Sequence, residues 1–302
     1  MPNILGSNSS IYITDRGNHR ILRLGDMTGT IGSEFGTKGS GNNQFNQPTG
    51  IFVDSTDRIY IADTGNDRIV RFDNITGKGW TAFGTKGNGN NQFNKPTGIF
   101  VDSANRIYIA DMDNHRLVRL DDMTGKGWTT FGTKGSVKKN DEAQFNFQRP
   151  TGLFVDSLNQ IYIADLDNNR IVRVNDMTGI GWIALGSNGK GNNQFNGPTK
   201  VFVDTANRIY VSEFITRRVV QMDDMTGKGW TTIEPDPSNN QLGGLTAVFV
   251  PNPDQLYVVD MLNSRTMHLN FVTGKGWALN ETLNTISFSR NKIFRPHDIY
   301  NR

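Results

Sequence analysis

The sequence contains no cysteine, few histidines and no long apolar run. Its 302 residues include no cysteine and four histidines, which excludes disulfide bonds and thiolate metal sites. No run of about 18 apolar residues occurs, so no membrane-spanning helix is expected. The first residues, MPNILGSNSSIYITD, lack a basic region followed by an apolar stretch, so the sequence as written predicts no signal peptide. The resulting expectation is a soluble protein that is cytoplasmic by default, with no membrane partner.

Glycine and polar residues are abundant, whereas hydrophobic residues make up only 35% of the chain. With 33 glycines, this composition favours many short strands joined by polar turns over a helical bundle. The formal net charge of +3 is slight. It permits local basic patches but does not by itself predict a nucleic-acid partner.

A unit of about 48 residues repeats along the chain. The tyrosine of a string close to IYIAD recurs at spacings of 48, 48, 54, 48 and 47 residues, which gives six copies. These tyrosines are Tyr12, Tyr60, Tyr108, Tyr162, Tyr210 and Tyr257. In the unit 93–140, four apolar runs of strand length are separated by Gly, Asn, Asp or Pro. This pattern predicts one four-stranded antiparallel sheet per unit.

Each predicted sheet has two apolar faces, and one sheet cannot bury both by itself. Six sheets around an axis bury each face on the next sheet, so we predict an all-β, six-bladed β-propeller that forms a single domain over residues 1–302. A solenoid is the competing arrangement, but it usually needs polar caps. The C-terminal string FRPHDIYNR matches the innermost-strand string FNKPTGIFVD. The C-terminal strand is therefore expected to complete blade 1 and close the ring, although Ile4 and Leu5 could occupy the same place.

The repeated strings PTGIFVD, IYIAD and GNHRI or DNHRL resemble the NHL repeat. The resemblance covers nearly the whole chain in six copies that keep the same register. It implies a six-bladed propeller. NHL-type propellers serve as protein-binding, RNA-binding and sensor modules, and some relatives are lyases or hydrolases, so the resemblance implies a fold without implying one function.

An acidic and a basic residue recur at fixed places in every unit. The acid ends the second strand, and an arginine follows five residues later. The pairs are Asp15 and Arg20, Asp63 and Arg68, Asp111 and Arg116, Asp165 and Arg170, Glu213 and Arg218, and Asp260 and Arg265. A catalytic site is needed once rather than once per blade, so we interpret these pairs as ion pairs that tie each hairpin shut. No residue of the chain is predicted to be catalytic.

Two other residue types repeat with the blades. The loop after each acid contains Gly-Asn or Asp-Asn in four units, as in Gly17-Asn18 and Asp113-Asn114, and such residues suit a backbone with positive φ. Five tryptophans recur after TGKG or a close variant. We expect them to pack on the outer strands; an aromatic ligand cage is the alternative.

The histidines do not form a pattern that is typical of a metal site. His19 and His115 occupy the same loop position in blades 1 and 3, which are not neighbours in a ring. We therefore predict no metal ligand and no cofactor. Metal-dependent propeller lyases and hydrolases place histidine or acidic ligands on the central pore, so a divalent cation in the central channel remains the alternative.

Lysines in the connections between blades raise the question of RNA binding. These lysines are Lys38, Lys86, Lys134, Lys138, Lys139 and Lys190. Acidic residues are expected on the same face, and few aromatic residues are interleaved for base stacking. A solvated polar rim is therefore the favoured interpretation, and RNA binding is a third option.

Apolar substitutions set the loops of blades 5 and 6 apart. The position after each acid carries Arg16, Thr64, Met112, Leu166, Phe214 and Met261 in turn. Ile215 and Leu262 add a second apolar residue in blades 5 and 6, and Lys200 replaces the glycine of Pro-Thr-Gly. The predicted binding surface contains Phe214, Ile215, Met261 and Leu262, with Lys200 at its edge and Met112 and Leu166 continuing the series. Alternatively, these side chains pack beneath the connections between blades.

These observations favour a non-enzymatic binding scaffold that presents a loop-rich face to a protein or another macromolecule. The near-identity of blades 2 to 4 supports this interpretation, because one catalytic pocket would be expected to break the symmetry around the pore. The alternative is a propeller lyase or hydrolase with a divalent cation in the central channel, and the third option is RNA binding by the loop face. The sequence does not identify the partner.

Overall fold

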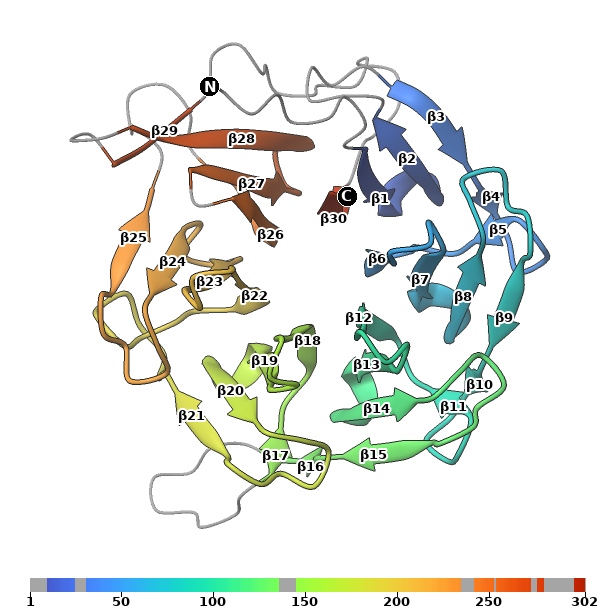
Figure 1. Cartoon of the computed structure of the whole chain (residues 1–302), viewed down its shortest axis with the longest axis horizontal. Helices are drawn as coiled ribbons and strands as arrows, with labels where there is room; N and C mark the ends of the chain where they lie inside the picture. Colours follow the sequence, from blue (N-terminus) through green and yellow to red (C-terminus); the bar gives the residue numbers. More distant parts are fainter. Residues whose placement is uncertain are drawn as a thin grey trace.

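The computed structural model describes residues 10–24, 31–135, 145–234, 242–252, 254–272, 276–279 and 296–301. These residues form six four-stranded antiparallel sheets, which are arranged as blades around a central axis (Figure 1). The predicted all-β, six-bladed propeller is therefore confirmed. No helix in the described part of the chain is both long and apolar enough to cross a membrane.

The strands of each blade follow one another from the axis outward. Blade 1 consists of β30 (Pro296–Asn301), β1 (Ile11–Asp15), β2 (Arg20–Leu24) and β3 (Ile31–Phe35). Blade 2 consists of β6 (Ile51–Val53), β7 (Ile59–Asp63), β8 (Arg68–Phe72) and β9 (Thr81–Phe83). Blade 3 consists of β12 (Pro96–Val101), β13 (Ile107–Asp111), β14 (Arg116–Leu120) and β15 (Thr129–Phe131). Blade 4 consists of β18 (Pro150–Val155), β19 (Ile161–Asp165), β20 (Arg170–Val174) and β21 (Ile183–Leu185). Blade 5 consists of β22 (Pro198–Val203), β23 (Ile209–Glu213), β24 (Val219–Met222) and β25 (Thr231–Ile233). Blade 6 consists of β26 (Leu245–Asn252), β27 (Gln255–Asp260), β28 (Arg265–Val272) and β29 (Gly276–Leu279).

Short parallel pairs of strands stiffen three connections between blades. They are β4 (Thr37–Lys38) with β5 (Gln44–Phe45), β10 (Thr85–Lys86) with β11 (Gln92–Phe93), and β16 (Thr133–Lys134) with β17 (Asn146–Phe147). The loop between the second and third strands of blades 1 to 4 contains one 3-10 turn. These turns are Arg16–Asn18, Thr64–Asn66, Met112–Asn114 and Leu166–Asn168.

The C-terminal strand closes the ring, as predicted. Strand β30 pairs antiparallel with β1, with Ile299 opposite Ile13. The backbone N–H of Asp298 also donates to the Thr14 hydroxyl at 2.9 Å. The competing segment Ile4-Leu5 lies outside the described residues.

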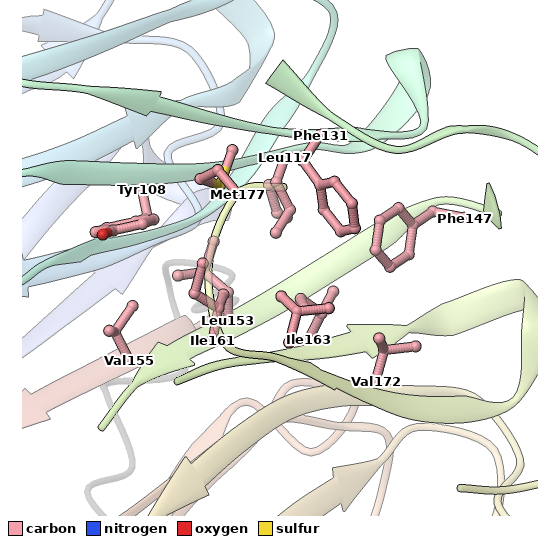
Figure 2. Packing of buried hydrophobic residues seen from close by; sticks show 12 residues of the cluster. Tyr108, Leu117, Phe131, Phe147, Leu153, Val155, Ile161, Ile163, Val172 and Met177 are labelled. Atoms are coloured by element: carbon pink, nitrogen blue, oxygen red, sulfur yellow. The ribbon is translucent and has the colours of Figure 1, made fainter. Parts of the chain in front are cut away.

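The core lies between neighbouring blades. The strand sequence IYIAD is buried along its whole length in blades 2, 3 and 4, because each blade is covered on both faces. Figure 2 shows one such interface, where Leu117 and Phe131 of blade 3 meet Leu153 and Ile163 of blade 4. Each fully buried side chain of this size contributes roughly 1.5–3 kcal/mol. The core thus joins blade to blade.

Four tryptophans, Trp80, Trp128, Trp182 and Trp230, pack against the apolar clusters of the blades, as expected; the side chain of Trp277 lies outside the described residues. Trp80 stacks on Phe72 with ring centroids 5.7 Å apart and also contacts Phe45 at 5.3 Å. Trp182 repeats this arrangement against Phe147 at 5.5 Å. The aromatic cage is therefore wrong for these two residues, because their rings fill the space between neighbouring blades.

The predicted ion pairs are confirmed in all six blades. In blade 3, Arg116 Nε donates to Asp111 Oδ2 at 2.9 Å, and the Asp111 carboxylate is fully buried. The same carboxylate accepts the backbone N–H of Asn94 at 2.7 Å, and Arg116 donates to the carbonyl oxygen of Gln92 at 2.9 Å. In blades 2 to 6 the acid of the pair accepts a backbone N–H of the preceding connection, so the pair also ties its hairpin to that connection. Burial raises the pKa of Asp111, although the N–H donors and Arg116 oppose the shift.

The structure corrects the prediction for the loop asparagines. Positive φ falls on the following residue, for example His115 at 56°, and not on Asn114. Asn114 ends the 3-10 turn and its Nδ2 donates to Asp111 at 2.8 Å. The next residue has a function that sequence analysis missed. His115 Nδ1 accepts the backbone N–H of Arg149 at 3.1 Å, and Asn169 Oδ1 accepts that of Gly197 at 2.9 Å.

This contact, which we call the latch, occurs in blades 1 to 4. His19 and Asp67 make the equivalent contacts to Gln47 and Lys95. In each case the acceptor holds the connection that leads into the next repeat's inner strand. The latch explains why His, Asp and Asn alternate at one position, since each side chain offers an acceptor at the same place.

Candidate functional site

A cavity of about 860 Å³ opens at the centre of the ring, on the face that carries the 3-10 turns. Residues of all six blades line it, and its size falls in the range of pockets that hold small molecules or inserted side chains. Its wall comes from the loops between second and third strands. Its floor comes from the first residues of the inner strands.

Six of the seven residues predicted to bind a partner line this cavity. They are Met112, Leu166, Lys200, Phe214, Ile215 and Met261. Leu262 lies outside the lining but is 55% exposed directly beside Met261. The structure therefore gathers residues from four different blades, far apart in the sequence, at one mouth. Their role in binding stays a prediction.

The apolar residues of the mouth differ in exposure. Met112 is only 8% exposed, so the alternative of packing beneath a connection describes it correctly. Phe214 is half-buried, and its ring lies on Gly244, where an added Cβ would meet the ring at 2.3 Å. Ile215 is 56% exposed. The free apolar surface of the mouth is thus concentrated on blades 5 and 6.

The floor of the cavity carries a ring of threonines, and in blades 2 to 5 the threonine hydroxyl is bonded to the next blade. Thr97 Oγ1 donates to the carbonyl oxygen of Thr151 at 3.1 Å, and Thr151 Oγ1 donates to that of Thr199 at 2.9 Å. Thr49 and Thr199 make corresponding bonds. The adjacent glycines permit this close approach, because a Cβ on Gly98 would lie 2.4 Å from the Thr151 oxygen. Sequence analysis missed this ring, although the string Pro-Thr-Gly carries it.

Lys200 occupies the glycine position in blade 5, and its partner comes from blade 1, on the far side of blade 6. Its Nζ lies 2.9 Å from Oδ2 of Asp298, which stands at the same position of the inner strand of blade 1. Both side chains are well buried, with exposed fractions of 13% and 5%. Oδ2 of Asp298 also accepts the backbone N–H of Ile51 at 3.1 Å. Lys200 therefore lies on the floor of the cavity and helps to hold the strand that closes the ring; the sequence placed it at the edge of a surface.

Thr246 is the exception in the threonine ring. It is 7% exposed and lines the cavity, but its hydroxyl has no hydrogen-bond partner among the described residues. It stands in blade 6, between Lys200 of blade 5 and Asp298 of blade 1. A buried hydroxyl without a partner is costly, so this part of the floor has unused hydrogen-bonding capacity.

Charged side chains form the opposite part of the rim, on blades 2 to 4. Lys95 Nζ lies 2.7 Å from Asp113, and Arg149 lies 3.7 Å from Asp113 and 3.8 Å from Asp167. These pairs are half-exposed and contribute little to stability. Among the predicted lysines, Lys86 lines the cavity, whereas Lys138 and Lys139 lie outside the described residues.

The described residues contain no group of three His, Cys, Asp or Glu side chains that could hold a metal ion. His19 and His115 are engaged in latches of separate blades. Burial, followed by the charge of a nearby lysine, lowers the pKa of both side chains below the ordinary value. Each is therefore a neutral acceptor at pH 7, as the latch requires.

Comparison with known proteins supports the repeat assignment. The family model described as the NHL repeat matches residues 45–72, 93–120 and 147–174, which run from the connection to the third strand in blades 2, 3 and 4. No curated protein matches the sequence.

Solved structures of similar shape cover nearly the whole chain. A chain of the nidogen/laminin complex has 16% sequence identity and a TM-score of 0.70, with 97% of this chain and 98% of that chain covered. A streptogramin B lyase has 14% identity and a TM-score of 0.61, with coverages of 98% and 88%. A catalytically inactive virginiamycin B lyase from Staphylococcus aureus with quinupristin has 13% identity and a TM-score of 0.61, with coverages of 100% and 94%. At these identities the likeness shows the fold alone.

Proposed function

The chain is an NHL-repeat six-bladed β-propeller, and we propose that it is a non-enzymatic scaffold that binds a protein partner with its loop-rich face. One observation carries the proposal. Ile215 and Leu262 are large apolar side chains that are more than half exposed, on neighbouring loops at the mouth of the cavity. The equivalent loops of blades 2 to 4 carry Gly-Asn or Asp-Asn at this place.

Leaving these apolar side chains in contact with water is unfavourable. Covering apolar surface stabilises a complex by about 25 cal/mol for each Å² removed from water. A partly buried Phe214 next to two exposed aliphatic side chains, with a polar rim around them, is the composition typical of an interface core. The nidogen/laminin complex contains a chain of this fold, which is consistent with a protein partner.

The experiment is capture of partners from the source organism on immobilised propeller. The wild type is compared with the double variant Phe214→Ser, Leu262→Ser. The matched control is Leu158→Ser, Ile180→Ser, which removes two exposed apolar side chains (72% and 62% exposed) from turns on the other face. We expect the control to keep the captured proteins and the loop variant to lose them. A folded loop variant that keeps them all would contradict the proposal.

The alternative of a lyase or hydrolase with a divalent cation has a separate test. The described part of the chain offers no set of three metal ligands, so the donor set there does not fit a metal centre. Metal analysis of the purified protein decides the matter. A stoichiometric divalent cation would favour the enzyme, and salt-dependent retention on RNA would favour the third option.

A further inference from the structure

The floor of the central cavity changes character between blades 5, 6 and 1. Elsewhere each threonine hydroxyl is used and each neighbouring position is a glycine. In this sector three polar groups stand on successive blades: the ammonium of Lys200 on blade 5, the hydroxyl of Thr246 on blade 6 and the carboxylate of Asp298 on blade 1.

Hydrogen-bond donors without a partner among the described residues remain in this sector. The Asp298 carboxylate accepts the N–H groups of Ile51 and Ile299 and the ammonium of Lys200, at 3.1, 3.0 and 2.9 Å. Lys200, by contrast, uses one of its three N–H bonds, and the Thr246 hydroxyl uses none within the described residues. Lys200 and Thr246 can therefore both donate hydrogen bonds to an oxygen atom of a ligand.

The charged side chains that line the whole cavity also favour a negatively charged ligand. Basic side chains outnumber acidic ones in the lining, and they still do, five to four, when Asp113 on the rim is counted with its partners Lys95 and Arg149. The basic residues are Arg16, Lys86, Lys95, Arg149 and Lys200, and the acidic residues are Asp67, Asp167 and Asp298. A negatively charged group inside the cavity is thus favoured over a positive one.

The wall above this sector is apolar. Phe214 and Ile215 of blade 5 and Met261 of blade 6 line the cavity on the same side as Lys200 and Thr246. We propose that the central cavity binds a carboxylate carried on an apolar group, with the carboxylate on Lys200 and Thr246 and the apolar group against Phe214 and Met261. Such a group is offered by a small free acid or by an acidic side chain between apolar residues of a docked protein.

Where the carboxylate belongs to a protein partner, this inference rests on the proposed function. It then adds which side chain the partner inserts into the cavity. It can be tested without any partner. The probes are 4-phenylbutyrate with its neutral amide, and the blocked peptide acetyl-Leu-Glu-Leu-amide with its glutamine counterpart. Binding is measured by calorimetry and by chemical-shift changes.

In the wild type we expect at least one acid to bind roughly tenfold more tightly than its neutral counterpart, because a hydrogen bond to a charged group is worth more than one between neutral groups. A preference shown only by 4-phenylbutyrate points to a free acid, and one shown only by the peptide points to an inserted side chain. Lys200→Met should abolish the preference. Equal binding of acid and amide, or no binding of any probe up to about 10 mM, would overturn the proposal.

Thr246→Val keeps the proposal testable if Lys200→Met folds poorly. Removing a hydroxyl that has no partner among the described residues should leave the melting temperature unchanged or raise it, while acid binding weakens several-fold. Thr97→Val is the stability control, because the Thr97 hydroxyl donates to Thr151 and its loss should lower the melting temperature. Unchanged acid binding in Thr246→Val would count against the site. Probe binding can fail while partner capture succeeds, so the two proposals fail separately.

Discussion

Blades 3 and 5 share strands, ion pairs and aromatic packing, but their loops differ. In blade 3 the loop Met112–Asn114 is followed by His115, which latches the next connection, and Met112 is buried. In blade 5 the loop places Ile215 in solvent, and the inner strand β22 places Lys200 on the floor of the cavity. The comparison separates two tasks. The repeated residues build the ring, and the residues that depart from the repeat shape the mouth and floor of the cavity.

The largest expected effect on stability is at the buried ion pairs that all blades share. Arg116→Ala leaves the buried Asp111 carboxylate without its cation, and we expect a loss of roughly 3–5 kcal/mol of stability. Arg218→Ala in blade 5 should cost about as much, since Glu213 is equally buried. Thermal unfolding measures both. The exposed Arg217→Ala is the control, with a change of under about 0.5 kcal/mol. A large loss in blade 3 alone would mean that the shared framework differs between blades.

The second prediction concerns the buried pair of Lys200 and Asp298. Lys200→Met leaves Asp298 buried with only backbone donors, and we expect a loss of roughly 2–3 kcal/mol. The double variant Lys200→Met, Asp298→Asn should recover much of that loss, because no unpaired charge remains. A double-mutant cycle in chemical denaturation gives the coupling energy. Additive losses would show that the pair does not hold the closing strand.

A smaller effect is expected from pH, and it falls on the latches. Burial lowers the folded-state pKa of His19 and His115, whereas the unfolded chain titrates near about 6.5. Protonation therefore favours unfolding, so the latch contribution is complete above about pH 7 and is lost as the pH falls below about 6.5. The double variant His19→Asn, His115→Asn keeps an acceptor like that of Asn169 but cannot titrate. We expect it to lose less melting temperature between pH 7.5 and 5.5 than the wild type.

His268 sharpens this test because it titrates separately. Burial lowers its pKa to about 4, and it remains in both proteins. It therefore cancels when the two pH profiles are subtracted. Identical profiles for the wild type and the double asparagine variant would refute a role for the two latch histidines in acid sensitivity.

The smallest effect on stability is expected at the exposed loop of blade 6. Leu262 is 55% exposed, so Leu262→Ser should change the free energy of unfolding by less than about 0.5 kcal/mol. Met112→Ser, at a buried position in the corresponding loop of blade 3, should cost about 2 kcal/mol or more. Comparable losses at the two sites would mean that the blade 6 loop packs as part of the framework.

The fold could be predicted almost completely from the sequence, because its information is repeated six times. Register, blade number and the Asp111–Arg116 type of pair follow from the spacing of identical strings. Ring closure by the C-terminal strand followed from the match between two fragments. The site could be predicted only in part. Phe214 and Ile215 were visible as departures from the repeat, and the structure places them at one cavity.

Other features of the site depend on contacts that the sequence does not encode locally. The partner of Lys200 lies 98 residues away and on a blade that is not its neighbour. Nothing in the spacing of Pro-Thr-Gly shows that Thr246 lacks, among the described residues, the bond its counterparts make. The latch was missed because His115 looks like a variable loop residue until its acceptor atom is seen beside Arg149.

The central claim is that the departures in blades 5 and 6 form the binding surface, while blades 2 to 4 serve as framework. Hydrogen–deuterium exchange of the propeller with and without its captured partner tests this claim most directly. We expect added protection in the loops at 213–217 and 260–264, with little change in 111–115. Protection centred on the loops of blades 2 to 4, with 213–217 unchanged, would contradict the account.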